Sequence, residues 1–198
     1  MAKSSSTTKK KLPYAHIAFL ISGFLLLLYY LFTKGVPSLG KDVASIITFV
    51  VDLIVLISAI GFYCYMVFSP KGLTGTIRAL APALVIFVVM GQYSMPSVQP
   101  DINKIVSAIA TGAATLIVFC GFLFVFLHKW IFGEIFGWSC FVYAIYVIVA
   151  YFVIMIMDLV KGGEFDVMLL LSTICLFMAS GLMAYGALRI CKSKNPLD

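Results

Sequence analysis

Asp52 has the clearest capacity for chemistry, because it is an acid within a long apolar segment. Residues 43–68 contain no other Asp, Glu, Lys or Arg. Asp52 lies about ten residues into this segment, which is roughly 15 Å along a membrane-spanning helix. A carboxylate at that depth is costly unless it is protonated, paired or hydrated. Asp52 is therefore expected to face the interior of a helix bundle.

The neighbours of Asp52 at steps of three and four residues are small or carry hydroxyl groups, and on a helix they share its face. They are Ser45, Thr48, Ala59 and Tyr63. One interpretation is a proton- or cation-binding site, with Ser45 and Thr48 extending a path outward. The other is a structural carboxyl, hydrogen-bonded to a Tyr or Ser of another helix. Since Lys and Arg occur only near the ends of the apolar segments and not at the depth of Asp52, a neutral or ion-coordinating Asp52 is favoured over a fixed ion pair.

Two further apolar segments carry similar faces. Small residues let helices approach closely, and hydroxyl groups form hydrogen bonds between them. Such faces either pack helices together or line a common cavity of the second, fourth and sixth segments, with Asp52 at its centre. Their members are Asn103, Ser107, Thr111, Ala114 and Gly121 in the fourth segment, and Thr173, Ser180, Ala184 and Ala187 in the sixth. Ser107 and Thr111 are included among the candidate site residues.

The fifth apolar segment is rich in aromatic residues. Tyr143 and Tyr146 lie deep in it and need partners for their hydroxyl groups. They are candidate partners for Asp52, although packing or lipid-facing positions are the favoured interpretation. Trp130 and Trp138 lie nearer the start, where indole rings anchor helices at the membrane interface.

Histidines and cysteines give no metal site. His16 and His128 are expected near the same interface, and two histidines at one depth can ligate haem or a metal. Interface histidines are more often solvated, so no metal or cofactor is expected. The five cysteines form no C-x-x-C pair, which excludes a zinc site or disulfide framework. All five are interpreted as small packing residues: Cys64, Cys120, Cys140, Cys175 and Cys191. For Cys64 and Cys191, which lie near helix ends, S-acylation is an alternative.

Catalytic motifs are missing from the sequence. It contains no G-x-S-x-G, H-E-x-x-H, S-x-x-K, phosphate-binding lysine loop or G-x-G-x-x-G. No apolar segment places a nucleophile beside a histidine and a carboxylate. An enzyme embedded in the membrane is therefore the least favoured interpretation.

The composition is that of an integral membrane protein. Of the 198 residues, 63% are hydrophobic and 11% are charged, whereas a soluble domain is about 45–50% apolar and about 25% charged. The net charge of +6 comes from Lys and Arg near the ends of apolar segments. This placement indicates topology and contact with lipid headgroups, and it excludes a nucleic-acid partner.

Six apolar segments are long enough to cross a membrane at about 20 residues each. The sequence predicts an all-α bundle of six transmembrane helices. The third is the least regular, because Pro82 lies near its start. Residues 1–12 are expected to form a basic cytoplasmic tail, 13–190 the membrane domain and 191–198 a C-terminal cytoplasmic tail. The first segment is too long, and its end too bulky, for a cleaved signal peptide. The segments are 14–33, 43–68, 77–94, 104–127, 135–157 and 167–190.

The distribution of Lys and Arg predicts the orientation. With six crossings, ten of the 14 Lys and Arg lie on the side of both termini and four on the other. If the third segment is re-entrant, five crossings remain, and the two sides then hold eight and six Lys and Arg residues. Positive charge favours the cytoplasmic side, so we expect six crossings in a cell membrane with both termini cytoplasmic.

The expected function is that of a small transport subunit that binds a substrate or lets an ion or solute permeate. The candidate site residues are Asp52, Thr48, Ser45, Ser107, Thr111, Tyr143 and Tyr146. Membrane lipids are expected partners, together with protein subunits or further copies of the chain. The alternative is a structural or accessory subunit of a larger membrane complex, with Asp52 in a dry helix contact.

Overall fold

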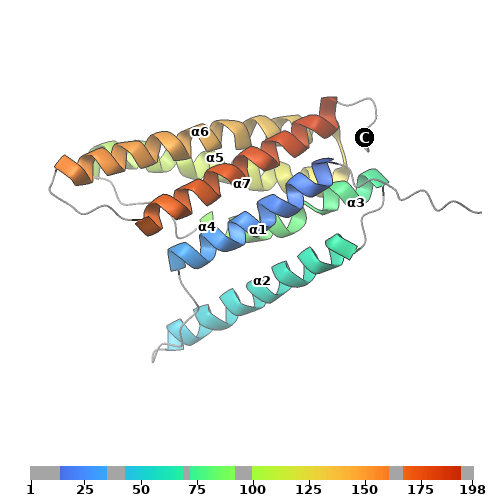
Figure 1. Ribbon diagram of the computed structural model, residues 1–198, viewed down its shortest axis with the longest axis horizontal. Coiled ribbons are helices and arrows are strands. Elements are labelled where there is room, and N and C mark those ends of the chain that lie inside the picture. Colours follow the sequence, from blue (N-terminus) through green and yellow to red (C-terminus); the bar gives the residue numbers. More distant parts are fainter. Residues whose placement is uncertain (1–13, 35–42, 69–71, 92–99, 161–166, 193–198) are drawn as a thin grey trace, which may run out of the picture.

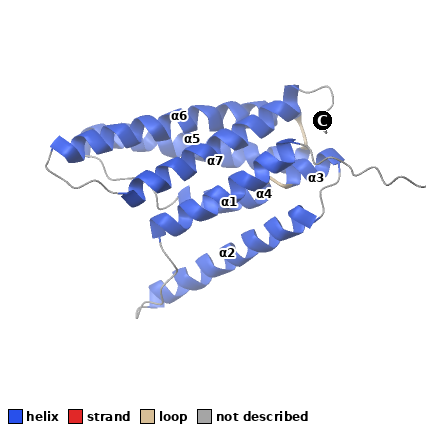
Figure 2. Ribbon diagram, in the orientation of Figure 1, coloured by secondary structure: helices blue, strands red, loops and turns tan. Residues whose placement is uncertain are grey.

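The computed structural model describes residues 14–34, 43–68, 72–91, 100–160 and 167–192. These residues contain no strand, and nearly all of them lie in helices (Figures 1 and 2). The predicted all-α fold is confirmed. The helices are α1 (Tyr14–Lys34), α2 (Val43–Phe68), α3 (Gly72–Arg78), α4 (Ala81–Gly91), α5 (Pro100–Leu127), α6 (Trp130–Val160) and α7 (Val167–Lys192).

Five segments of the described chain are long and apolar enough to cross a membrane. They contain 18 to 28 residues, against the roughly 20 that a bilayer core requires. Their outer surfaces expose many large apolar side chains, which suits contact with lipid rather than water. In α5, whose side chains are described from Gly112 on, Gly112–Leu127 forms a shorter apolar helix. The segments are Tyr14–Thr33, Val43–Tyr65, Gly72–Val89, Trp130–Met157 and Val167–Lys192.

The core of the bundle lies around α7 and α4. α7 packs along α1 on one side and α6 on the other, and α5 packs on α6. The short α4 lies between α1, α2 and α5, and Ala83 and Leu84 are completely buried there. α2 lies at the edge of the bundle, where it packs mainly on α4 and to a lesser extent on α1 (Figure 1).

Glycines allow α7 to approach both of its neighbours. A Cβ atom at Gly186 would lie 2.6 Å from the ring of Phe19 on α1, and one at Gly137 on α6 would lie 2.7 Å from Leu188 on α7. On the same helix, Ser180, Ala184 and Ala187 are also buried. The small face predicted for the last segment is therefore a packing face.

The third apolar segment is broken into two helices, instead of forming the single helix expected over 77–94. α3 ends at Arg78 and α4 begins at Ala81, with a turn at Ala79 and Leu80. Pro82 explains the break, because proline has no N–H group and its ring collides with the carbonyl four residues earlier, here that of Arg78. Residues 92–94 lie outside the described part of the chain.

The connection between α5 and α6 is shorter than expected. Only His128 and Lys129 separate the two helices, and α6 begins at Trp130 rather than at 135. His128 adopts a left-handed backbone conformation (φ 57°), which ends α5 and reverses the chain. The apolar pattern did not reveal this start, because Gly133 and Glu134 interrupt it.

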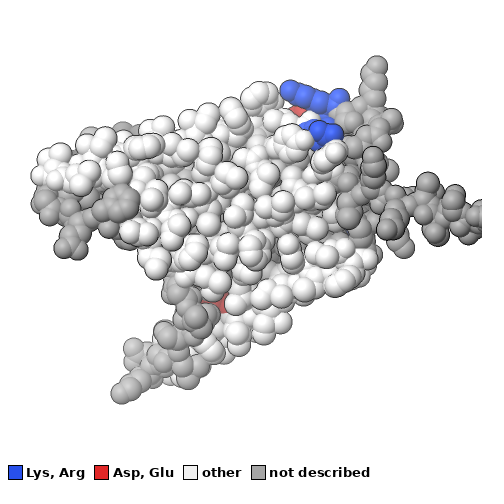
Figure 3. Space-filling view, in the orientation of Figure 1, with Lys and Arg blue, Asp and Glu red and all other residues white. Residues whose placement is uncertain are grey.

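The first and last described residues lie at the same end of the bundle. The guanidinium of Arg189 near the end of α7 is 5.0 Å from the ring centre of Tyr14, at the start of α1. On the face drawn in Figure 3, Lys and Arg gather at one end, and the surface between the two ends carries little charge. Of the predicted tails, 1–12 and 191–198, residues 1–12 and 193–198 lie outside the described residues, whereas Cys191 and Lys192 belong to α7 instead of the tail.

Candidate functional site

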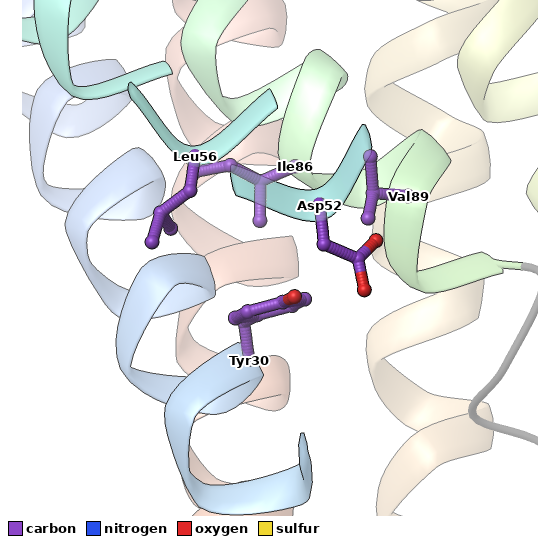
Figure 4. A pocket seen from close by; sticks show the side chains of 5 residues that line it. All are labelled: Tyr30, Asp52, Leu56, Ile86 and Val89. Carbon is purple, nitrogen blue, oxygen red and sulfur yellow. The ribbon is translucent and has the colours of Figure 1, made fainter. Parts of the chain in front are cut away.

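Asp52 lies in a small pocket between three helices. Tyr30 comes from α1, Asp52 and Leu56 from α2, and Ile86 and Val89 from α4. Figure 4 shows the carboxyl group of Asp52 beside the side chain of Tyr30, with Val89 behind it. Asp52 is half-buried and faces α1 and α4 at the edge of the bundle, whereas the sequence predicted a position in the bundle interior.

Tyr30 and Asp52 interact directly. A side-chain hydrogen bond joins them, in which the phenolic hydroxyl donates to the carboxylate, and the carboxylate also acts on Tyr30 electrostatically. Tyr30 is only 3% exposed. A buried donor of this kind compensates for part of the hydration that a carboxylate loses away from water.

The helical periodicity of α1 explains how Tyr30 reaches the pocket. Phe19, Ser22, Leu26 and Tyr30 follow one another at steps of three and four residues, and all four are buried. They form the face that α1 presents to the bundle. Tyr30 continues this face to within four residues of the end of α1 at Lys34.

The pocket lies near one end of the bundle. Val89 is two residues from the end of α4, and Tyr30 is four residues from the end of α1, so both lie within about 6 Å of their helix ends. These ends are opposite the end at which α1 begins. Asp52, although nine residues into α2, thus lies beside residues near the ends of α1 and α4.

The size of the pocket limits what it can hold. Its cavity volume is about 10 Å³, which is room for about one water molecule. Leu56, Ile86 and Val89 contribute only aliphatic surface. The pocket therefore suits a proton, a water molecule or a small ion, and it has no space for an organic solute.

The predicted outward path through Ser45 and Thr48 is not part of this pocket. The Thr48 side chain is exposed, and its hydroxyl donates to the carbonyl of Ala44 at 2.9 Å. Such a bond to the preceding turn satisfies the hydroxyl within its own helix. Ser45 is half-buried one turn earlier, and neither side chain lines the pocket.

Tyr143 and Tyr146 do not line the pocket either. Tyr143 packs edge-on against Phe87 of α4, with ring centres 5.5 Å apart, and Tyr146 lies 6.0 Å from Tyr143. Phe87 is adjacent in sequence to Ile86, which lines the Asp52 pocket. Neighbouring residues of a helix point in different directions, so α4 separates the two tyrosines from the acid.

The second, fourth and sixth predicted segments do not surround Asp52. They correspond to α2, α5 and α7, whereas α2 packs mainly on α4 and α1. Gly121 of α5 is buried against Leu84 and Phe136, so this part of its small face packs helices together. Ser107 and Thr111 belong to α5, but their side chains lie outside those that the structure describes.

One of the two histidines differs from the expectation of a solvated side chain. His16 is completely buried in α1 instead of being solvated. His128, in the turn after α5, has its Nδ1 atom 3.2 Å from the carbonyl oxygen of Phe126. Within the described residues, no three His, Cys, Asp or Glu side chains form a group that would hold a metal ion. Cys120, Cys140 and Cys175 are buried free thiols, in line with a packing role.

Sequence reasoning missed Tyr30, which it treated only as a bulky residue near the end of the first segment. A signal was available. The connection between α1 and α2 is short, spanning residues 35–42, so residues late in α1 lie beside residues early in α2. A tyrosine near the end of the first segment was therefore a nearer partner for Asp52 than any in the fifth.

Comparison of the chain with protein-family models, with curated proteins and with solved structures gives no match. The functional conclusions therefore rest on the residues and their geometry.

Proposed function

We propose that the protein is a small multi-pass transport protein of the cell membrane, in which Asp52 binds a proton or a small cation. The observation that carries this proposal is the half-buried carboxyl group of Asp52, hydrogen-bonded to the buried Tyr30 beside a one-water cavity. An acid within an apolar helix marks an ion or proton pathway by default.

The ligand that the pocket favours is a proton. Metal cations in proteins are held by several oxygen ligands, six to eight in the case of calcium. Among the residues that line the pocket, only Asp52 and Tyr30 have side-chain oxygens, and the others are aliphatic. A carboxyl group needs no further ligands to take up a proton, which also removes the cost of the buried charge.

Tyr30 would stabilise both forms of Asp52. Its hydroxyl donates to the ionised carboxylate, and after proton uptake it can still donate to the carbonyl oxygen of the neutral carboxyl group. Proton binding would thus leave the hydrogen bond of the pair in place. The single water that fits the cavity would carry the proton to the pair from the nearby helix ends.

We also propose six crossings with both termini in the cytoplasm. Two features support this topology: Tyr14 and Arg189 meet at one end of the bundle, and α3 with α4 makes an 18-residue apolar segment. In this orientation the cations with described side chains would lie on the cytoplasmic side, as the positive-inside rule requires. They are Arg78, Lys129, Arg189 and Lys192. The Asp52 pocket would then open toward the outer surface.

The proposal is tested by proton flux into proteoliposomes. A potassium diffusion potential, negative inside, is applied to vesicles that contain a pH-sensitive dye, and acidification of the lumen is recorded. We expect wild-type flux above that of empty vesicles, and Asp52→Asn should reduce it to the empty-vesicle level. Thr48→Val is the matched control, because it removes a polar group one turn away that is bonded to its own helix.

Two outcomes would contradict proton transport. Flux in Asp52→Asn equal to that of the wild type would remove Asp52 from the pathway. Absence of flux in the wild-type protein would instead favour the second candidate, an accessory subunit of a membrane complex. That candidate has one observation of its own, since among the described side chains of α2 only Ala59 is buried.

A further inference from the structure

The end of the bundle opposite the Asp52 pocket carries a cluster of basic and aromatic side chains. We call it the basic-aromatic cluster, and it joins the start of α1, the start of α6 and the end of α7. Its members are Tyr14, Trp138, Tyr185, Arg189 and Lys192. Neither the Asp52 pocket nor the proposed transport function involves these residues.

Arg189 is held in place by two tyrosines from different helices. Its guanidinium carbon lies 5.0 Å from the ring centre of Tyr14 and 5.8 Å from that of Tyr185. One of its nitrogens also donates to the Tyr185 hydroxyl at 2.8 Å. Contacts with aromatic faces restrict a guanidinium while leaving its charge in place. Arg189 is therefore a preorganised cation instead of a freely moving side chain.

Two more cations lie at this end of the bundle. The Lys192 ammonium is 5.6 Å from the ring centre of Trp138 on α6. Lys129 precedes Trp130, whose carbonyl oxygen lies 3.5 Å from the Cys191 thiol on α7. The acid described in this region is Glu134, which is close enough to Cys191 to act on it electrostatically. Among the described side chains around the start of α6 and the end of α7, the three cations outnumber this acid, so the region is positive.

The surface next to the cluster is apolar. From Tyr185 toward the start of α7, steps of three and four residues lead through Gly181 to Met178, Ile174 and Leu171. These three side chains are exposed and continue the same face. Gly181 lies between Met178 and Tyr185, and a Cβ atom there would have nothing within 4 Å. This side of α7 thus offers a shallow apolar track that leads away from the cations.

A ligand that suits both surfaces has an anionic head and an apolar tail. A soluble anion would use only the cations, and an acidic peptide would leave the apolar track without a partner. We propose that the basic-aromatic cluster binds the phosphate of an anionic phospholipid, whose acyl chain lies along the exposed face of α7. Basic pockets between helices at an aromatic interface bind such headgroups.

The proposal is tested by measuring lipid affinity with native mass spectrometry of the full chain. The protein in detergent is titrated with phosphatidylglycerol or with zwitterionic phosphatidylcholine. We expect the wild type to prefer phosphatidylglycerol. The double variant Arg189→Gln, Lys192→Gln should lose about 30-fold in affinity for it, or about fivefold for each cation removed. Arg78→Gln is the matched control, since Arg78 is an exposed cation on α3, outside the cluster.

The single variant Lys192→Gln guards against misfolding, because Lys192 is exposed and its loss leaves the Arg189 contacts intact. It should bind about fivefold more weakly with an unchanged melting temperature. Equal affinity of the wild type for both lipids would overturn the proposal, as would undiminished binding in the double variant or an equal loss in Arg78→Gln. Full competition by inorganic phosphate would assign the site to a soluble anion instead.

Discussion

Tyr30 in the last turns of α1 donates a hydrogen bond to Asp52 of α2, and this pair ties the most exposed helix of the bundle to its core. Tyr30 is buried with the core residues of α1, whereas nearly every other described side chain of α2 is at least partly exposed. The bond therefore has two roles in our interpretation. It holds α2 in place, and it presents an acid to the small cavity.

The first prediction concerns the structural role of this bond. Tyr30→Phe removes the donor and preserves the ring, which leaves the carboxylate without one of its hydrogen bonds. Hydrogen bonds to charged groups contribute about 1.5–3 kcal/mol, and we expect the free energy of unfolding to fall by about that amount. Unfolding in detergent, followed by circular dichroism, measures it.

Tyr63→Phe is the control for this measurement. Tyr63 lies on α2 and is half-buried, but it does not line the Asp52 pocket. Its loss of a hydroxyl should change stability by less than about 0.5 kcal/mol, as for substitutions away from special contacts. If both variants unfold at the same denaturant concentration, the bond between Tyr30 and Asp52 does not hold α2 to the bundle.

The second prediction compares two glycines on one helix. At Gly186 an added methyl group would meet the ring of the fully buried Phe19 at 2.6 Å, whereas at Gly181 it would meet nothing within 4 Å. Gly186→Ala forces α1 and α7 apart, and overpacking of this kind costs about 1–3 kcal/mol. Gly181→Ala should be neutral or gain up to about 1 kcal/mol, because alanine favours the helix.

Melting temperatures of the two glycine variants in the same detergent provide the measurement. Only Gly186→Ala should lower the value relative to wild type. Equal melting temperatures would show that α1 and α7 are not packed at Phe19 as closely as the structure has them.

Much of the fold could be predicted from the sequence, because apolar segments in a bilayer must form helices to satisfy their backbone groups. The first two predicted segments agree with α1 and α2 within a residue. Agreement was poorer where a backbone effect outweighed the hydropathy pattern. Pro82 divides the third segment, and the left-handed His128 allows α6 to begin directly after α5.

The candidate site was harder to predict than the fold. Hydropathy and charge identified Asp52, since one acid in an apolar segment stands out. They did not identify its neighbours, because packing between helices depends on which faces meet, and the periodicity of one helix does not specify its partner. α4 lies beside α2, so Ile86 and Val89 line the pocket while Tyr143 and Tyr146 lie elsewhere.

The third prediction concerns topology. With six crossings, a fluorescent protein fused after residue 198 and one fused before residue 1 should both fluoresce in the bacterial cytoplasm, while alkaline phosphatase fused at residue 163 should be active outside. The excess of Lys and Arg on the terminal side sets this orientation. Termini on opposite sides would mean five crossings, with the segment formed by α3 and α4 returning to the side from which it entered.

The last prediction concerns the break between α3 and α4. Pro82 cannot donate to the carbonyl of Arg78, and Leu80 instead donates to Ile77 at 3.1 Å, one residue nearer than in an α-helix. Pro82→Ala supplies the missing N–H group and removes the colliding ring, so α3 and α4 should join into one helix. Hydrogen exchange of the amides of Ala79 and Leu80 should then slow by at least tenfold, since a closed helical ladder opens less often.

Leu84→Ala serves as the control, because it removes buried packing in the same helix without restoring a donor, and it should speed exchange there. Faster exchange in Pro82→Ala would mean that the buried proline ring stabilises this region more than its missing hydrogen bond weakens it.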